Sequence, residues 1–141
     1  MPWTSAPGAG FTTGTPWLRL GPDATTHDVA TELADPDSVL ACYRRLIAAR
    51  RAEPSLQDGR LRLRPVGDPD VLGFRRLGSG PDVLVGIAFG AAGGRLDLPR
   101  RPAGGGWRPI VGSHRELPVV APGARSVELR GFEGLVLVAT P

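Results

Sequence analysis

The spacing of apolar residues along this chain changes from a helical period to a strand period. Between residues 36 and 52 apolar side chains recur at helical spacing, which predicts one helix with a single apolar stripe. The stripe consists of Val39, Leu40, Tyr43, Leu46 and Ile47. Asp35 is a favoured N-cap residue and Pro36 suits the first helical position, so we expect the helix to begin there. Pro54 is expected to end it.

From Gly59 onward the period is two. Arg60, Arg62 and Arg64 alternate with Leu61 and Leu63, which predicts a strand with one solvated and one buried face. Further strands are predicted at Val71–Leu77, Val83–Phe89, Arg95–Leu98, Trp107–Val111, Leu117–Val120, Ser126–Arg130 and Leu135–Thr140. Glycine- and proline-rich turns separate them. About eight short strands of this kind predict a mainly β fold, an antiparallel β-sandwich.

Composition within the strands predicts their positions in the sheets. Val83–Phe89 and Leu135–Thr140 are almost entirely apolar, as is typical of central strands covered on both faces. Pro109 and Pro118 remove a backbone donor, so their strands are expected at sheet edges.

The first 27 residues show no period and predict a long extended loop. Loops of this length are uncommon unless they line a site or are disordered. Trp3, Phe11 and Trp17 are the large aromatic residues of the loop, and disordered segments rarely contain tryptophan. We therefore expect an ordered loop, followed by a short helical turn at Asp28–Leu33.

Composition excludes several classes of protein. Gly (20) and Pro (15) are abundant among the 141 residues, but 41% hydrophobic residues argue against disorder. No apolar run approaches the roughly 18 residues of a membrane span, and the N-terminus shows no signal-peptide pattern, so we expect a soluble, cytoplasmic protein without membrane contact. The single Cys42 excludes an intrachain disulfide and is expected to be a half-buried structural thiol. His27 and His114 lack metal-site spacing, so neither a metal nor a cofactor is expected.

The formal charge of +3 comes from 17 arginines against 14 acidic residues. A nucleic-acid-binding protein gathers its basic residues on one face among aromatic side chains, whereas these arginines are scattered. We therefore expect no nucleic-acid partner. Arg60, Arg62 and Arg64 are interpreted as a solvated strand face, with anion binding as the alternative.

The carboxylates form no catalytic pattern. Most aspartates neighbour Gly or Pro, as turn and cap residues do; these are Asp23, Asp35, Asp58, Asp68, Asp70 and Asp82. Glu116, Glu128 and Glu133 lie in or beside predicted strands without a pairing pattern. The glycine clusters match neither a phosphate-binding loop nor a dinucleotide fingerprint.

An ordered set of short motifs resembles glycoside hydrolase family 13, in particular its α-glucosidases and oligo-α-glucosidases. The motifs are Met1-Pro2-Trp3-Thr4, Ala9-Gly10-Phe11-Thr12, Pro16-Trp17-Leu18, Ala34-Asp35-Pro36-Asp37-Ser38-Val39-Leu40, Tyr43–Arg50 and Leu129–Leu137. In that family the first motifs follow the eighth strand of a (β/α)8 barrel, the Tyr43–Arg50 motif belongs to the last barrel helix, and the final motif ends the C-terminal sandwich. Gly131 stands where the family usually has proline.

This resemblance implies that residues 1–57 are the last loop and last helix of a truncated barrel, and that residues 58–141 are the C-terminal sandwich domain. Retaining glycosidases need two carboxyl groups about 5–5.5 Å apart, and in this family they come from barrel strands upstream of the matching segment. The expected function is therefore that of a C-terminal fragment of an α-glucosidase-like hydrolase, a structural support that is not catalytic alone. An α-glucoside or malto-oligosaccharide would bind only in an intact barrel.

Two alternatives stay open. Trp3, Phe11 and Trp17 either contact substrate at the rim of the active site or anchor the loop against the barrel. The chain as a whole could instead be a stand-alone carbohydrate-binding β-sandwich module, with Trp107 or the loop aromatics as stacking platforms. A truncated barrel also predicts that the Val39–Ile47 stripe is exposed, with self-association through that helix face.

Overall fold

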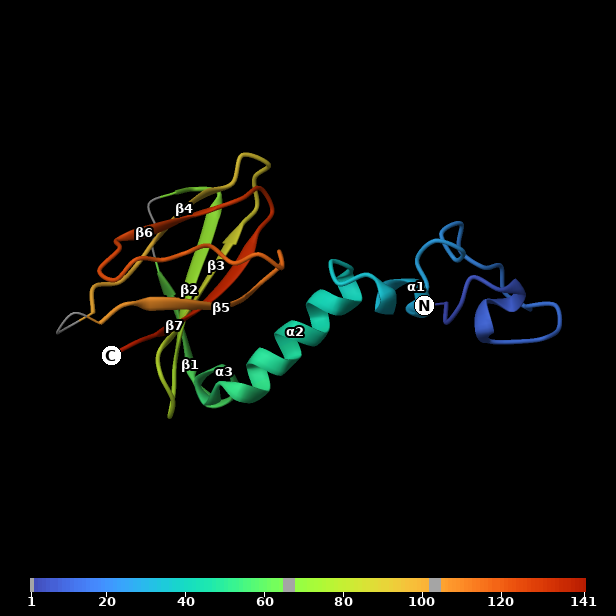
Figure 1. The fold of residues 1–141 in the computed structure, drawn as a ribbon, viewed down its shortest axis with the longest axis horizontal. Coiled ribbons are helices and arrows are strands. Elements are labelled where there is room, and N and C mark those ends of the chain that lie inside the picture. Colours follow the sequence, from blue (N-terminus) through green and yellow to red (C-terminus); the bar gives the residue numbers. More distant parts are fainter. Residues whose placement is uncertain (1, 65–67, 102–104) are drawn as a thin grey trace. The chain divides into compact units, whose positions relative to one another are not determined.

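The computed structural model describes residues 2–64, 68–101 and 105–141. Its elements (Figure 1) are η1 Pro7–Gly10, α1 Val29–Ala34, α2 Val39–Ala52, α3 Pro54–Asp58, β1 Arg60–Arg64, β2 Val71–Leu77, β3 Val83–Ala88, β4 Gly94–Asp97, β5 Trp107–Gly112, β6 Ser126–Leu129 and β7 Gly134–Ala139. The chain divides into two compact units, Met1–Arg44 and Arg45–Pro141. We call them the N-terminal unit and the sandwich unit and describe each by itself.

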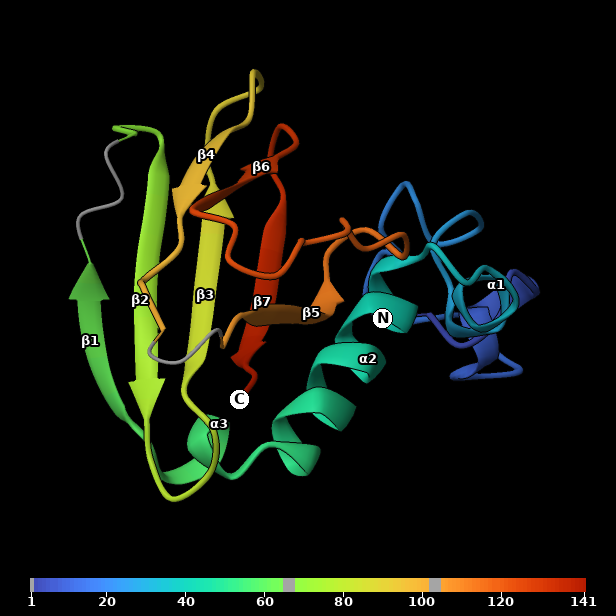
Figure 2. The ribbon, with the colours of Figure 1, turned by 60° about the vertical axis from the view of Figure 1, so that its left-hand side comes forward.

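The sandwich unit contains two antiparallel sheets. Five strands follow the order β1-β2-β3-β7-β5 (Figure 2), and β4 pairs with β6 in a sheet of two strands. The apolar strands β3 and β7 are interior strands, as predicted. β5 is an edge strand that carries Pro109, as predicted, and its register shifts between Pro109 and Val111.

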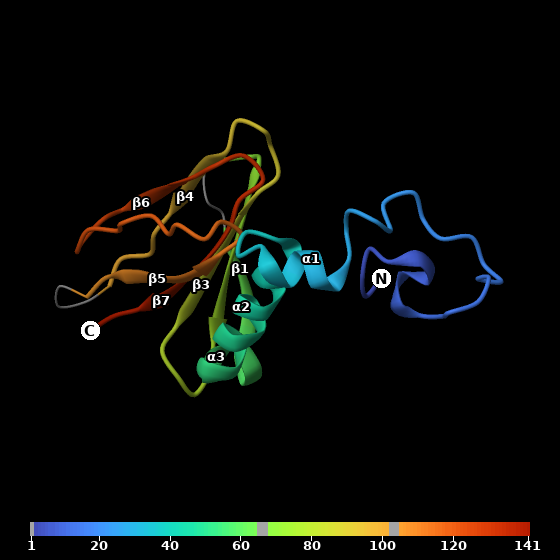
Figure 3. The same ribbon diagram turned by 45° about the vertical axis from the view of Figure 1, so that its right-hand side comes forward.

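The main core lies between the two sheets, with β4 and β6 over one face of the five-stranded sheet (Figure 3). Its fully buried side chains include Leu84, Leu96, Leu135 and Leu137. The antiparallel β-sandwich predicted from the sequence is therefore confirmed. Trp107 belongs to this core and is only 3% exposed, so the alternative of Trp107 as an exposed sugar platform is wrong.

The opposite face of the five-stranded sheet carries a second apolar cluster. Val83, Val85, Val111, Val136 and Val138 are its buried members. Ala49 of α2 and Leu56 of α3 pack against this cluster. The C-terminal part of α2 and the short helix α3 thus cover part of this face.

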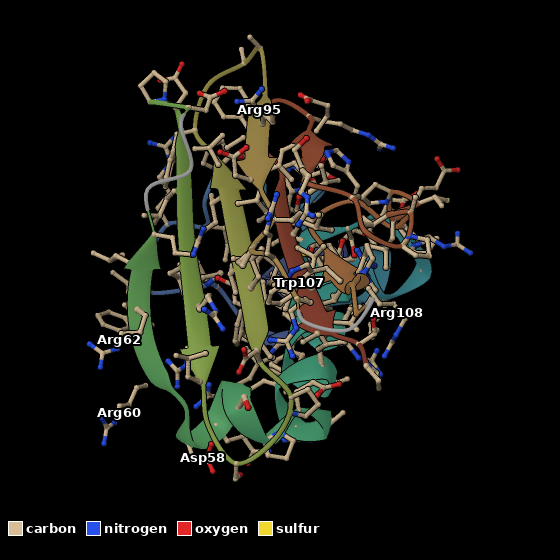
Figure 4. The ribbon with its side chains drawn as sticks, turned by 90° about the vertical axis from the view of Figure 1, so that its left-hand side faces the viewer. Asp58, Arg60, Arg62, Arg95, Trp107 and Arg108 are labelled. Atoms are coloured by element: carbon tan, nitrogen blue, oxygen red, sulfur yellow. The ribbon has the colours of Figure 1, made fainter. Side chains whose placement is uncertain are left out.

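The prediction that one face of β1 is buried is wrong. Leu61 is 52% exposed and Leu63 is 69% exposed; Arg60 and Arg62 are exposed as well, and Arg64 is half-buried. Arg60 and Arg62 project outward from this strand (Figure 4). β1 is an edge strand whose only ladder partner in the described chain is β2, so alternation along the strand does not correspond to burial.

The predicted strand Leu117–Val120 is also absent from the described fold. Leu117 and Val120 pack against the main core, whereas Val119 between them is 98% exposed. This segment joins neither sheet of the described chain, and Pro118 has no N–H to donate to a ladder. Leu117 and Val120 therefore anchor the segment by apolar contacts with the core.

The helices differ from the prediction at their ends. α1 begins after Asp28, as expected, but α2 begins at Val39 and not at Pro36. Pro54 does not simply stop α2, because it also begins α3, where its fixed φ suits the first helical turn. Ser79 links α3 to the β2–β3 turn by donating its hydroxyl to Asp58 over 2.6 Å, and this bond lowers the pKa of Asp58.

The apolar stripe of α2 is exposed, as predicted. Val39 is 67% and Tyr43 62% exposed in the N-terminal unit, and Ile47 is 47% exposed in the sandwich unit. No residue of α2 is buried. Cys42 is half-buried, as expected. Within the described ranges, no helix is both long and apolar enough to span a membrane.

Candidate functional site

The aromatic residues of the N-terminal loop form the candidate site. The rings of Trp3 and Phe11 lie edge to face, with centroids 6.4 Å apart and an interplanar angle of 62°, an arrangement that aromatic pairs favour. Trp17 makes no ring contact with them among the described residues and is 91% exposed. The structure therefore brings two of the three predicted site residues together and leaves the third apart.

A left-handed backbone turn creates the Trp3–Phe11 pair. Gly8, Ala9 and Gly10 all have positive φ angles, and buried Ala9 accepts the Trp3 N–H through its carbonyl over 2.9 Å. A Cβ atom on Gly10 would lie 2.8 Å from the Trp3 Cβ. The Ala9-Gly10-Phe11 motif thus permits the close approach of the two aromatic side chains.

The same loop is tied to the start of α1. The first free N–H groups of the helix, on Val29 and Ala30, donate to the carbonyls of Pro2 and Trp3 over 3.0 and 3.1 Å. These donors have no partner inside a helix, so the loop supplies the acceptors. The position of Trp3 is therefore fixed by backbone hydrogen bonds on both sides.

Asp28 completes the cap of α1. Its carboxylate accepts the Thr31 N–H over 3.0 Å and the Thr31 hydroxyl over 2.8 Å, and the residue is fully buried. Sequence reasoning identified Asp28 only as the beginning of a helical turn. The hydrogen bonds from Thr31 lower the pKa of Asp28 below its ordinary value of 3.8.

This lowered pKa predicts acid sensitivity of the loop anchor. A carboxylate with a depressed folded-state pKa contributes stability above the unfolded pKa, and the contribution disappears as the pH falls through the lowered value. We expect the protection factor of the Thr31 amide, measured by NMR as its exchange rate relative to an unfolded peptide at the same pH, to fall as the pH drops below 3.8. Asp28→Asn keeps an acceptor but removes the charge, and its exchange should lose this pH dependence. An unchanged pH dependence in Asp28→Asn would contradict the assignment.

The acidic Asp35–Ser38 motif is used for structure. Asp35 accepts the Asp37 N–H over 2.9 Å, and Ser38 accepts the Ala41 N–H over 3.1 Å as the cap of α2. Glu32 accepts the Leu40 N–H over 2.9 Å. The N-cap of α2 is therefore Ser38 and not Asp35, and the carboxylates of Asp35 and Glu32 accept backbone hydrogen bonds near the start of this helix.

Other carboxylates of the described chain also hold turns and strands. Asp68 accepts the N–H groups of Asp70 and Arg95, both over 3.1 Å. Asp82 pairs with Arg75 and Arg101, and buried Glu133 accepts the Arg130 N–H over 2.7 Å. The described residues include no group of three or more His, Cys, Asp or Glu able to hold a metal ion.

Sequence reasoning missed one concave feature of the sandwich unit. A groove of about 430 Å³ lies between the C-terminal part of α2 and β5. Its lining consists of Arg45, Ala48, Ala49, Ala52, Glu53, Ile110, Val111, Gly112, His114, Arg115 and Leu117. The groove brings the alanine-rich face of α2 close to β5, about 60 residues later in the sequence. Such a long-range contact leaves no local signal in the sequence.

Comparison with known proteins shows that the aromatic loop lies within a catalytic-domain match. Residues 1–59 match the family model described as "Alpha amylase, catalytic domain". A probable oligo-1,6-glucosidase 2 of Bacillus subtilis is 39% identical over 60% of this chain and 15% of its own length. The trehalose-6-phosphate hydrolase of Escherichia coli is 30% identical over 96% of this chain and 24% of its own length.

The solved structures agree with the sequence matches over nearly the whole chain. The trehalulose synthase of Pseudomonas mesoacidophila has a TM-score of 0.84 and 32% identity over 99% of this chain. The chain is therefore similar to proteins of the alpha-amylase family. It spans about a quarter or less of the length of these relatives.

The catalytic-domain match covers only the first part of the chain. The catalytic-domain match ends at residue 59, immediately before the first sandwich strand at Arg60. The aromatic loop, α1, α2 and α3 therefore correspond to alpha-amylase catalytic-domain sequence. One relative, a variant of the trehalulose synthase, has been solved with its substrate sucrose.

Proposed function

We propose that this chain acts as the C-terminal support region of an α-glucosidase-like glycoside hydrolase. Residues 1–57 would supply the last loop and last helix of the barrel, and residues 58–141 the sandwich domain. The observation that carries the proposal is the coincidence of the catalytic-domain match over residues 1–59 with a 32% identical structural match over 99% of the chain.

Within such an enzyme, Trp3, Phe11 and Trp17 would form part of the rim around the substrate. Their exposed fractions of 55%, 60% and 91% leave aromatic faces available, and an aromatic face provides a rigid apolar surface against which a sugar ring can pack. The substrate would be an α-glucoside or malto-oligosaccharide, bound only when the rest of a barrel is present. The proposed location is cytoplasmic, and the exposed stripe of α2 would favour self-association of the chain alone.

The chain alone is expected to show no glycosidase activity. The described carboxylates that make hydrogen bonds serve as helix caps, turns and ion pairs, whereas a retaining mechanism needs an acid and a nucleophile about 5–5.5 Å apart. The assay is release of nitrophenol from a nitrophenyl α-glucoside by the purified chain. An oligo-1,6-glucosidase serves as the positive control, and turnover above the buffer rate would refute the support role.

A further inference from the structure

The edge strand β1 carries a row of positive charge on one face of the sheet. Its residues alternate arginine and leucine over Arg60–Arg64, and successive side chains of a strand point to opposite faces. Arg60, Arg62 and Arg64 therefore share one face. Arg62 lies directly opposite Arg75 of β2, and directly paired residues point to the same side of a sheet. We call these four residues the arginine row; Figure 4 shows two of them, Arg60 and Arg62.

Asp82 neutralises only part of this charge. Its carboxylate forms ion pairs with both Arg75 and Arg101, so one carboxylate is shared by two guanidinium groups. Within residues 2–64, 68–101 and 105–141, the arginines of β1 form no ion pair with a carboxylate. Like charges directly opposite each other destabilise a sheet, and Arg62 beside Arg75 is such a pair. An anionic partner would therefore relieve the repulsion within the arginine row.

The backbone of β1 is available for pairing as well. β2 lies on one side of β1, and no strand of the described sandwich unit lies on the other. Alternate residues of an edge strand direct their N–H and C=O groups outward, where another extended segment can pair with them. Prolines and bulges commonly block such pairing, but β1 has no proline and its register with β2 is regular over all five residues.

The side chains of β1 determine which segment can pair with it. A second copy that placed leucine beside leucine would also place arginine beside arginine, which is unfavourable. An acidic segment would instead place carboxylates beside the guanidinium groups, and such charge-assisted pairs are strong and often bidentate. On the other face of β1, Leu61 is 52% and Leu63 69% exposed. Apolar residues between the acidic ones would cover these leucines.

We propose that β1 binds an extended acidic segment of a partner protein by strand addition, with carboxylates of the segment against the arginine row. The segment has Asp or Glu at alternate positions and apolar, β-branched residues between them, which favour extended backbone. Its backbone extends the five-stranded sheet beyond β1. This binding goes beyond the support role proposed above, because it requires only β1 and the neighbouring strand β2.

A short fluorescein-labelled peptide in which Glu and Val alternate is the probe, and fluorescence anisotropy measures its binding to the full chain. Arg60→Glu/Arg62→Glu should weaken binding at least about tenfold, because favourable cross-strand pairs become repulsive. Both side chains are exposed, so the variant should keep its melting temperature. The matched control, Arg108→Glu/Arg130→Glu, makes the same change of charge at exposed residues outside β1 and should bind like the wild-type chain. Arg108 lies on β5, at the opposite edge of the sheet (Figure 4).

Two further measurements test direct contact and strand pairing. A second peptide, with Lys in place of every Glu, should bind the Arg60→Glu/Arg62→Glu variant more tightly than it binds the wild-type chain. Strand addition also predicts slower hydrogen exchange at the outward-facing amides of β1 when the Glu peptide is bound, because these amides would then donate to the new strand. NMR measures this exchange residue by residue.

Four outcomes would overturn the proposal. The first is that the wild-type chain does not bind the Glu peptide. The second is an equal loss of binding in the control variant, since net charge alone would then attract the peptide. The third is binding without slower exchange in β1, which would mean that charges meet without strand pairing. The fourth is tighter binding of single-stranded DNA of the same charge, which would identify a nucleic acid as the partner.

Discussion

Replacement of Trp107 by alanine is expected to lower the free energy of unfolding of the sandwich unit by about 3–5 kcal/mol. Trp107 is 3% exposed in the main core, and its indole N–H donates to the buried Pro99 carbonyl over 2.9 Å. The Arg101 guanidinium lies 5.7 Å from the ring centroid. The substitution therefore removes a large packed volume, a cation–π contact and a buried hydrogen bond together.

Chemical denaturation monitored by far-UV circular dichroism measures this loss. Val119→Ala is the control, because Val119 is 98% exposed in the same unit and its truncation should change stability by less than about 0.5 kcal/mol. Trp107→Phe keeps a ring but leaves the Pro99 carbonyl without its donor, so an intermediate loss of about 1–3 kcal/mol is expected. A Trp107→Ala variant of unchanged stability would contradict the role of Trp107 in the main core.

The interior strands were predictable because their burial on both faces follows from composition. β3 and β7 are apolar at nearly every position, and no edge position would stabilise such strands. The edge position of β5 follows equally directly from the missing N–H of Pro109. In both cases a local property of the residues determines the position in the sheet.

The errors arise where burial depends on another part of the structure. Alternation along β1 predicts which side chains share a face, and the pairing confirms this, but it does not reveal whether anything covers that face. Leu61 and Leu63 would be buried only if a further layer lay over β1. They are exposed because no such layer covers them in the described chain. The periodicity of five residues does not reveal whether a covering layer exists.

The candidate site was predictable only in part, for a similar reason. Trp3, Phe11 and Trp17 were selected because tryptophan is unusual in an aperiodic loop, and Trp3 and Phe11 do lie together. The left-handed turn at Ala9 and the carbonyl caps from Pro2 and Trp3 were not predicted. Such bonds join backbone atoms, and nearly every residue type supplies the same backbone donors and acceptors.

The second large effect is expected at the β3–β4 turn, where Gly93→Ala should destabilise the sandwich unit by about 2–4 kcal/mol. Gly93 has a φ angle of +76°, and a Cβ atom there would lie 2.1 Å from the backbone oxygen of Leu129. Leu129 pairs with Gly94 at the end of the β4–β6 ladder. A backbone oxygen cannot rotate away as a side chain can, so the ladder must shift and lose hydrogen bonds.

Gly123→Ala separates this collision from the intrinsic strain of a left-handed alanine. Gly123 has the same φ angle of +76°, but nothing lies within 4 Å of its added Cβ, so its variant should lose only about 1–2 kcal/mol. The difference between the two variants in denaturant midpoint, at unchanged slope, measures the contribution of the Leu129 contact. Equal losses would mean that the β4–β6 ladder accommodates the methyl group, and the close approach of this turn to β6 would then contribute nothing to stability.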